Sequence, residues 1–237
     1  MTTLFILAGG FGTRLRSVVT DAPKALAPIG SHPFLRLQLE GWIGHGLRSF
    51  VFLLHHRADL IIDYLQKEKK LLRDCEVRWV IEPNPMGTGG AVSYAISELN
   101  FEGEFLLTNA DTWLSEGVAN MLTKDTPTIG VVKLENTSRY GQIKFNKEFF
   151  VEAFVEKGLS QSAGSVNAGL YKLHSALFDK YKGQPFSLET ELLPELVQNK
   201  SLRAVPLNTN FIDIGIPADY ARFCDWVKQG GKGSLCN

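Results

Sequence analysis

Cysteine is scarce in this chain, with only Cys75, Cys224 and Cys236 among 237 residues. An odd number at such wide spacing forms no disulfide framework and matches no metal-binding spacing. We therefore expect reduced, ordinary thiols, as is usual in a cytoplasmic protein.

Net charge is absent as well, because 25 Lys and Arg residues balance 25 Asp and Glu residues. No basic stripe is apparent, so the sequence does not indicate a partner that is a long nucleic acid. A site for a small anion remains compatible with this balance, since it requires only a few local cations.

Long apolar runs are also missing. The apolar stretch near the N-terminus has no basic flank before it and is too short for a signal peptide. No segment reaches the length needed to span a membrane. We expect a cytoplasmic protein without a membrane partner, and we leave self-association into a homo-oligomer open.

The chain does contain a regular alternation of short apolar runs and amphipathic stretches. Strands are predicted at 4–8, 50–54, 77–81, 104–108 and 128–134, and helices at 34–44, 58–71, 89–99 and 117–122. This alternation predicts an α/β fold with a mostly parallel sheet and helices on both faces. Ligands bind such sheets beyond the carboxyl ends of the strands.

The pattern changes after residue 134. Strands at 140–146, 150–155 and 165–172 are predicted to be antiparallel, followed by a helix at 187–198, strands at 201–206 and 211–214, and a helix at 217–228. We expect this part to extend the same sheet, so that residues 1–229 form one domain. Residues 230–237 are predicted to be a flexible tail.

A glycine-rich loop follows the first predicted strand directly. Gly9, Gly10 and Gly12 let the backbone approach a phosphate closely and expose its N–H groups. Arg14 adds a guanidinium that suits bidentate contact with phosphate oxygens, and Lys24 adds a second cation. The loop matches neither the P-loop nor the dinucleotide-binding fingerprint.

The composite of Gly-Gly-Phe-Gly-Thr-Arg-Leu at 9–15 and Pro-Lys at 23–24 resembles the signature of the sugar-phosphate nucleotidyltransferases. The resemblance runs through Asp-Ile-Gly-Ile-Pro at 213–217. It implies a Rossmann-like fold in which residues 1–134 mainly bind the nucleotide and residues 135–229 mainly bind the sugar. Such enzymes join a nucleoside triphosphate to a sugar 1-phosphate and release pyrophosphate, so the implied partners are small-molecule substrates.

The same resemblance places the nucleotide. The loop would wrap the triphosphate, Lys24 would bind phosphate where the new bond forms, and the segment 82–91 would read the base. Glu82 could accept the N1–H and amino group of guanine together. Taken alone, this segment could equally be a glycine-rich helix start that packs closely, but together with the first loop it favours base binding. The expected catalytic residues are Arg14, Lys24 and Asp111. The expected nucleotide-binding residues are Leu7, Ala8, Gly9, Gly10, Gly12, Thr13, Arg14, Glu82, Gly87, Thr88, Asn109 and Asp111.

Asp111 and Asp213 each end a predicted strand and are the expected metal ligands. Two carboxylates suit Mg²⁺, a hard cation that also takes phosphate oxygens and waters. Either aspartate alone could instead cap a helix. Where the family commonly has glycine before the first aspartate, this chain has Ala110.

Three later segments resemble the sugar-binding side of the family. The expected sugar-binding residues are Gly141, Glu156, Lys157, Asn167 and Gly169. The pair at 156–157 could also be an ordinary solvated charged pair. His55 and His56 have no metal-binding spacing, and Trp42 and Trp79 are predicted to be core residues.

The segments 9–28, 85–91 and 211–217 look most like those of short bacterial guanylyltransferases acting on manno-heptose 1-phosphate or mannose 1-phosphate for capsule or surface-glycan synthesis. Two alternatives stay open. One is a uridylyl- or cytidylyltransferase acting on another sugar phosphate. The other is a non-catalytic regulatory protein that binds a sugar nucleotide.

Overall fold

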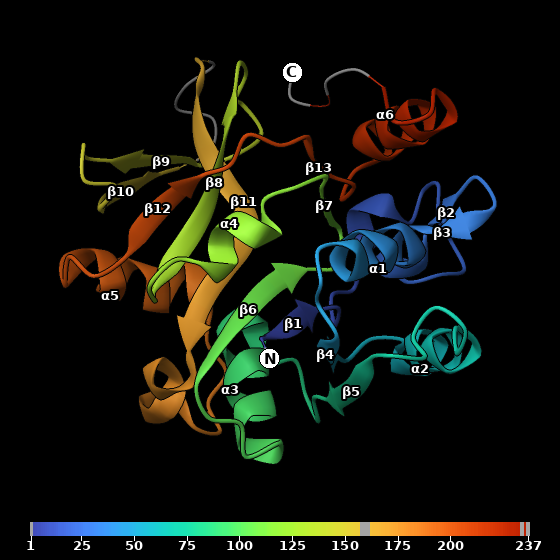
Figure 1. The fold of residues 1–237 in the computed structure, drawn as a ribbon, viewed down its shortest axis with the longest axis horizontal. Helices are drawn as coiled ribbons and strands as arrows, with labels where there is room; N and C mark the ends of the chain where they lie inside the picture. Colours follow the sequence, from blue (N-terminus) through green and yellow to red (C-terminus); the bar gives the residue numbers. More distant parts are fainter. Residues whose placement is uncertain (1, 157–161, 233–234, 236–237) are drawn as a thin grey trace.

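The computed structural model describes residues 2–156, 162–232 and 235, and a nine-stranded mixed sheet forms its centre (Figure 1). The strands of this sheet are β1 (Thr3–Leu7), β4 (Ser49–Leu54), β5 (Glu76–Ile81), β6 (Glu104–Asn109), β8 (Thr128–Leu134), β9 (Gln142–Phe145), β10 (Val151–Val155), β11 (Gly164–His174) and β12 (Arg203–Pro206). The α-helices are α1 (Phe34–Gly44), α2 (Ala58–Lys67), α3 (Gly87–Glu98), α4 (Val118–Leu122), α5 (Leu193–Gln198) and α6 (Pro217–Lys228). Two small sheets pair β2 (Pro28–Ile29) with β3 (His32–Pro33) and β7 (Thr112–Leu114) with β13 (Phe211–Asp213).

The parallel half of the main sheet consists of β6, β1, β4 and β5 in that spatial order. Leu7, the last residue of β1, pairs with Leu53 of β4 on one side and with Asn109 of β6 on the other. The segments that follow these three strands therefore leave the sheet at the same edge. This is the edge at which open α/β sheets bind ligands.

The alternation of side chains along β1 supplies two separate cores. Leu4 and Ile6 belong to the cluster that packs against α1 and α2, whereas Phe5 belongs to the cluster that packs against α3. Each such buried side chain contributes about 1.5–3 kcal/mol relative to exposure. Helices thus cover both faces of the sheet, as the sequence predicted.

The second half of the chain adds antiparallel strands. β11 runs antiparallel to β6, β8 and β9, and β9 pairs with β10. β12 then returns parallel to β8. The predicted fold class is confirmed: an α/β arrangement around a mixed sheet, flanked by helices and extended by antiparallel strands.

The short β7–β13 pair brings the C-terminal part of the chain beside the segment that follows β6. It places Asp213 opposite Thr112, and the backbone N–H of Ile214 donates to the carbonyl of Asp111. A third core cluster, which includes Ile212 and Phe223, holds α6 against this pair. As a result, two aspartates far apart in the sequence lie beside each other.

The structure differs from the prediction in a few elements. α2 ends at Lys67 instead of residue 71, where Glu68 leaves the helical conformation and accepts a hydrogen bond from Arg36 at 2.7 Å. The predicted helix at 187–198 begins with a π-helical turn, Leu188–Leu192, before α5. Trp79 is 36% exposed instead of buried, because its strand β5 lies at the sheet edge.

Beyond residue 232 the described residue is Leu235, which is buried and donates its backbone N–H to Asn210 at 2.8 Å. The flexible tail at 230–237 stays a prediction. Among the described residues, we find no helix with the length and apolar character that a membrane crossing demands.

Candidate active site

A cavity of about 550 Å³ opens at the carboxyl ends of β1, β4 and β6. We call it the nucleotide cavity. Its lining residues are Leu7, Ala8, Gly9, Gly10, Phe11, Arg14, Pro23, Lys24, Ala25, His55, Glu82, Pro85, Gly87, Thr88, Ala91, Asn109, Ala110, Asp111, Glu189 and Asp213. Most of the residues predicted to bind the nucleotide are in this set. Gly12 and Thr13 are not, although they belong to the loop that forms one wall.

The backbone of the glycine-rich loop packs closely against neighbouring side chains at Gly9. A Cβ atom on Gly9 would lie 3.0 Å from Oε1 of Glu82 and 3.1 Å from Cβ of His55, so a larger residue would push these side chains apart. Gly12 adopts φ 65°, which glycine reaches without strain. The loop then enters a 3-10 turn, Thr13–Leu15.

Glu82 has a structural role that the sequence did not reveal. Its Oε2 accepts the backbone N–H of Met86 at 2.8 Å, which fixes the start of the loop that leads into α3. Burial raises the pKa of the Glu82 carboxyl, and the bond from Met86 offsets part of that rise. Oε1 lies on the side of Gly9.

Charged groups meet at the centre of the site. Lys24 Nζ donates to Oδ2 of Asp111 at 2.8 Å, and the backbone N–H of Gly215 donates to Oδ1 of Asp213 at 2.6 Å. Burial raises the pKa of Asp213, and the nearby charge of Asp111 raises it further. One lysine faces two carboxylates here, so an additional cation would balance the charge at the centre of the site.

These two carboxylates fit a hard divalent cation, which takes oxygen donors and completes its shell with phosphate and water. Within residues 2–156, 162–232 and 235, no group of three or more His, Cys, Asp or Glu residues could hold a metal ion by itself. A cation at Asp111 and Asp213 would thus depend on substrate oxygens as well.

A second cavity of about 330 Å³ adjoins the first and shares Asn109, Glu189 and Asp213 with it. We call it the sugar cavity. Its other lining residues are Thr112, Tyr140, Gly141, Gln142, Ile143, Phe154, Val155, Asn167, Gly169, Tyr171, Leu193 and Phe211. No lysine or arginine lines it among the residues that the structure describes.

The floor of the sugar cavity is a break in the pairing of β11 with β8, between Asn167 and Tyr171. Asn167 donates to the Tyr171 hydroxyl at 2.7 Å and accepts the backbone N–H of Gly169 at 2.9 Å. Gly169 has φ 66°, and a Cβ there would lie 2.9 Å from Nδ2 of Asn109. The position therefore requires glycine.

Three of the predicted sugar-binding residues, Gly141, Asn167 and Gly169, line this cavity. Glu156 is exposed and does not line it. Lys157 falls outside the described residues.

Several lining residues were missed by the sequence analysis. Glu189 lies in the π-helical turn, lines both cavities and accepts a hydrogen bond from Thr88 at 2.6 Å. His55 lines the nucleotide cavity, and its Nδ1 lies 3.2 Å from the carbonyl oxygen of Glu82. The position of His55 directly after a buried strand was the signal that could have identified it.

Comparison with known proteins identifies a matching family and several relatives. A family model described as nucleotidyl transferase matches residues 4–229. A D-glycero-alpha-D-manno-heptose 1-phosphate guanylyltransferase from Campylobacter jejuni is 31% identical over 220 residues, which cover 92% of this chain and 96% of that protein. A mannose-1-phosphate guanyltransferase from Schizosaccharomyces pombe is 30% identical over 223 residues. The match covers 91% of this chain but only 61% of the length of that relative.

Among solved structures, HddC from Yersinia pseudotuberculosis, crystallised in complex with GMP-PN, superposes with a TM-score of 0.84 at 33% identity. The superposition covers 96% of this chain and 100% of the HddC chain. A UDP-glucose pyrophosphorylase in complex with UDP-glucose shares the fold at 17% identity, with a TM-score of 0.80.

Proposed function

Because this chain belongs to the nucleotidyl transferase family, we propose that it transfers a guanylyl group from GTP to a manno-configured sugar 1-phosphate. The acceptor is D-glycero-α-D-manno-heptose 1-phosphate or mannose 1-phosphate, and the products are the GDP-sugar and pyrophosphate. One observation carries the proposal: the nucleotide cavity and the sugar cavity meet at Asn109, Glu189 and Asp213, beside Lys24 and Asp111.

The chemistry requires positioning more than proton transfer. A phosphate oxygen of the sugar 1-phosphate attacks the α-phosphorus, a new P–O bond forms, and the bond to the β-phosphate oxygen breaks as pyrophosphate leaves. Since the attacking oxygen is already anionic, no general base is needed. Arg14 and Lys24 line the nucleotide cavity and would neutralise charge on the reacting phosphates.

Asp111 and Asp213 would hold a divalent cation, and we propose Mg²⁺. When bound, the cation would neutralise phosphate charge at the centre of the site. Lys24, which is paired with Asp111 in this structure, would then be released toward the phosphates.

Guanine is the proposed base for two reasons. Oε1 of Glu82 is available beside Gly9 to accept a donor from guanine N1 or its amino group. The relatives from Campylobacter jejuni and Schizosaccharomyces pombe are named as guanylyl- and guanyltransferases, and HddC was crystallised with GMP-PN.

The sugar cavity supports a neutral, hydroxyl-rich ligand. Its polar groups are mainly amides, hydroxyls and backbone, which suit the hydrogen-bonding of a sugar ring. The substrates in the relatives' names support a manno-configured acceptor. We also propose a role in capsule or surface-glycan synthesis in the cytoplasm.

The test is a grid of GTP, ATP, UTP, CTP and dTTP against mannose 1-phosphate, manno-heptose 1-phosphate, glucose 1-phosphate and N-acetylglucosamine 1-phosphate, with pyrophosphate release as the signal. The proposal predicts that GTP with a manno-configured acceptor gives the highest kcat/KM. A tenfold higher kcat/KM with UTP or CTP would replace the guanylyl assignment by uridylyl or cytidylyl transfer. No release in any combination, together with tight binding of a GDP-sugar, would indicate the non-catalytic alternative.

A further inference from the structure

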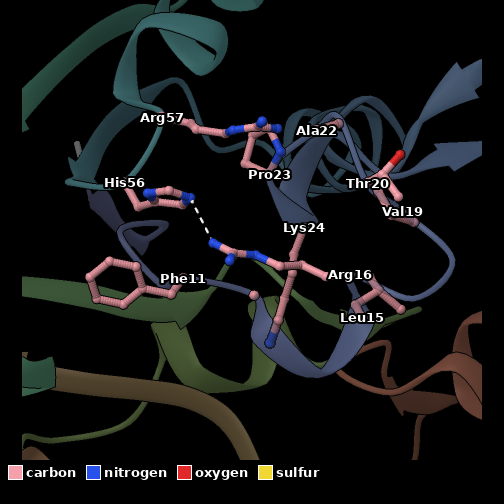
Figure 2. A pocket seen from close by; sticks show the side chains of 11 residues that line it. Phe11, Leu15, Arg16, Val19, Thr20, Ala22, Pro23, Lys24, His56 and Arg57 are labelled. Carbon is pink, nitrogen blue, oxygen red and sulfur yellow. Dashed lines mark hydrogen bonds between the residues drawn. The ribbon is translucent and has the colours of Figure 1, made fainter.

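A third cavity, of about 230 Å³, lies beside the glycine-rich loop (Figure 2). It is far larger than the space that a single water needs. Phe11, Pro23 and Lys24 line both this cavity and the nucleotide cavity, so the two adjoin at the loop. Arg16, His56 and Arg57 line the third cavity but not the nucleotide cavity. We call it the arginine cavity.

The arginine cavity is cationic, and no carboxylate lines it among the residues that the structure describes. Across the described part of the chain, neither Arg16 nor Arg57 forms an ion pair with an acidic residue. Lys24 contributes its stem, while its ammonium group is paired with Asp111 in the neighbouring cavity. Guanidinium groups without acidic partners that line one cavity favour an anion with several oxygens, because each offers a planar fork of donors.

The local chain geometry separates Arg16 from Arg14. In the 3-10 turn Thr13–Leu15 there are three residues per turn, so Arg14 and Arg16 point to different sides of the loop. The residue between them, Leu15, is buried. Arg14 accordingly lines the nucleotide cavity, and Arg16 lines the arginine cavity.

Arg57 has a backbone conformation that arginine seldom adopts, with φ 54° and ψ 40° immediately before α2. A left-handed conformation of this kind costs on the order of 1 kcal/mol or more for a residue other than glycine, and such residues cluster at functional sites. Figure 2 shows the Arg57 side chain extended across the cavity, near Pro23.

Arg16 is held in place from one side. Its Nη2 donates to Nε2 of His56 at 3.2 Å, in the tautomer that carries the imidazole proton on Nδ1 (Figure 2). The ring of Phe11, itself 48% exposed, is tilted against His56 at 5.1 Å between ring centroids. Since arginine has five N–H donors, the bond to His56 leaves the others for a ligand.

We propose that the arginine cavity holds a diphosphate group through Arg16 and Arg57: the β- and γ-phosphates of the bound triphosphate, which leave as pyrophosphate. This inference rests on the proposed function. In-line attack requires the leaving group opposite the attacking oxygen. The sugar cavity joins the nucleotide cavity at Asn109, Glu189 and Asp213, whereas the arginine cavity joins it at Phe11, Pro23 and Lys24. The two junctions share no residue, so the acceptor and the leaving group would occupy separate cavities.

The experiment measures the binding of three probes by calorimetry: inorganic pyrophosphate, GTP and GMP, each with Mg²⁺. The variants are Arg16→Gln and Arg57→Asn, since asparagine tolerates positive φ. Arg73→Gln is the control, because Arg73 is an exposed arginine paired only with its neighbour Asp74. Loss of a charge-assisted hydrogen bond should weaken the binding of pyrophosphate and of GTP about 10-fold or more in each variant. GMP, which lacks the terminal phosphates, should bind all four proteins alike.

Kinetics provide a second readout with the same proteins. Arg16→Gln and Arg57→Asn should raise KM for GTP about 10-fold and leave KM for the sugar 1-phosphate unchanged. If Arg57→Asn unfolds, Arg57→Lys replaces it and should show a smaller loss, because a point charge substitutes only in part for the fork.

Unchanged pyrophosphate and GTP binding in folded variants would overturn the proposal. Equal weakening of GMP would overturn it too, since that would place the arginines at the nucleoside. If the binding of pyrophosphate weakens and the binding of GTP does not, the cavity binds the free product and not the triphosphate. That result would contradict the in-line arrangement. Because these measurements need no turnover, they can fail or succeed independently of the guanylyl-transfer assignment.

Discussion

The nucleotide cavity and the sugar cavity differ in how the chain builds them. The nucleotide cavity is formed by loops at the carboxyl ends of parallel strands and concentrates charge, with Arg14, Lys24, Asp111 and Asp213 in its wall. The sugar cavity lies at a break in the pairing of β11 with β8. Apart from Glu189 and Asp213, which it shares with the nucleotide cavity, its lining residues in the described part of the chain are uncharged. Charge in one cavity suits phosphate chemistry, and neutral hydrogen-bonding groups in the other suit selection of a sugar.

This contrast predicts a division of labour. Substitutions in the charged cavity should reduce kcat, because they remove groups that stabilise charge in the transition state. Substitutions in the neutral cavity should raise KM for the sugar 1-phosphate and leave KM for the triphosphate unchanged.

The largest effect is expected for Lys24→Ala. Lys24 is the cation paired with Asp111 at the centre of the site, and removing one such electrostatic contact costs about 10²–10³-fold in kcat. Steady-state kinetics on a variant with the circular dichroism spectrum of the wild type checks this. A loss of less than about tenfold would remove Lys24 from the reacting centre.

Asp213→Asn should lose about 10²-fold in kcat/KM at low Mg²⁺ and recover part of it at high Mg²⁺, since one of two ligands is weakened. The matched variant Asp225→Asn changes an exposed aspartate of α6 and should behave as wild type. Full activity of the wild type in excess chelator would contradict the metal assignment altogether.

The acid side of the pH profile should reflect Asp213. Burial and the charge of Asp111 raise its pKa, so the protonated form persists to higher pH than for an ordinary aspartate. Activity should fall about tenfold for each pH unit below this pKa, because only the ionised carboxylate binds a cation. More Mg²⁺ should move the decline to lower pH, since cation and proton compete. If the decline of activity at low pH does not respond to Mg²⁺, a group other than Asp213 is responsible for it.

Asn167→Ala should raise KM for the sugar 1-phosphate about five- to tenfold and leave KM for GTP unchanged. It also removes the hydrogen bonds that Asn167 makes with Tyr171 and Gly169. Asn120→Ala, on the exposed surface of α4, is the control. An equal rise in both KM values would show that the two cavities are not independent.

The smallest effect is expected for Glu82→Gln. Glutamine can still accept the Met86 N–H, so the loop should keep its conformation. Loss of the second carboxylate oxygen should lower the preference for GTP over ATP by about fivefold. An unchanged preference would mean that backbone groups alone read the base.

The sequence predicted the charged cavity better than the neutral one. Gly9, Arg14 and Lys24 lie within one short motif, and their proximity follows from the chain itself. Asp213 was predicted from its place at the end of a strand, but its position beside Asp111 depends on the β7–β13 pairing, and β7 has only three residues.

Other features depended on tertiary contacts that no local pattern encodes. Glu189 reaches the site because a π-helical turn replaces the expected start of a helix. Arg57 reaches the arginine cavity through a left-handed backbone conformation, which arginine does not signal in a sequence. Trp79 was misassigned to the core because the sequence does not show that β5 is the last strand of the sheet.

The central claim is that a phosphate oxygen of the sugar 1-phosphate attacks the α-phosphorus of GTP across the junction of the two cavities. The most direct test uses mannose 1-phosphate or manno-heptose 1-phosphate with ¹⁸O in the non-bridging phosphate oxygens, with the products observed by ³¹P NMR. Direct transfer predicts that all of the label is retained in the GDP-sugar and that the pyrophosphate is unlabelled. Label in the pyrophosphate, or GDP and inorganic phosphate in place of a GDP-sugar, would contradict it.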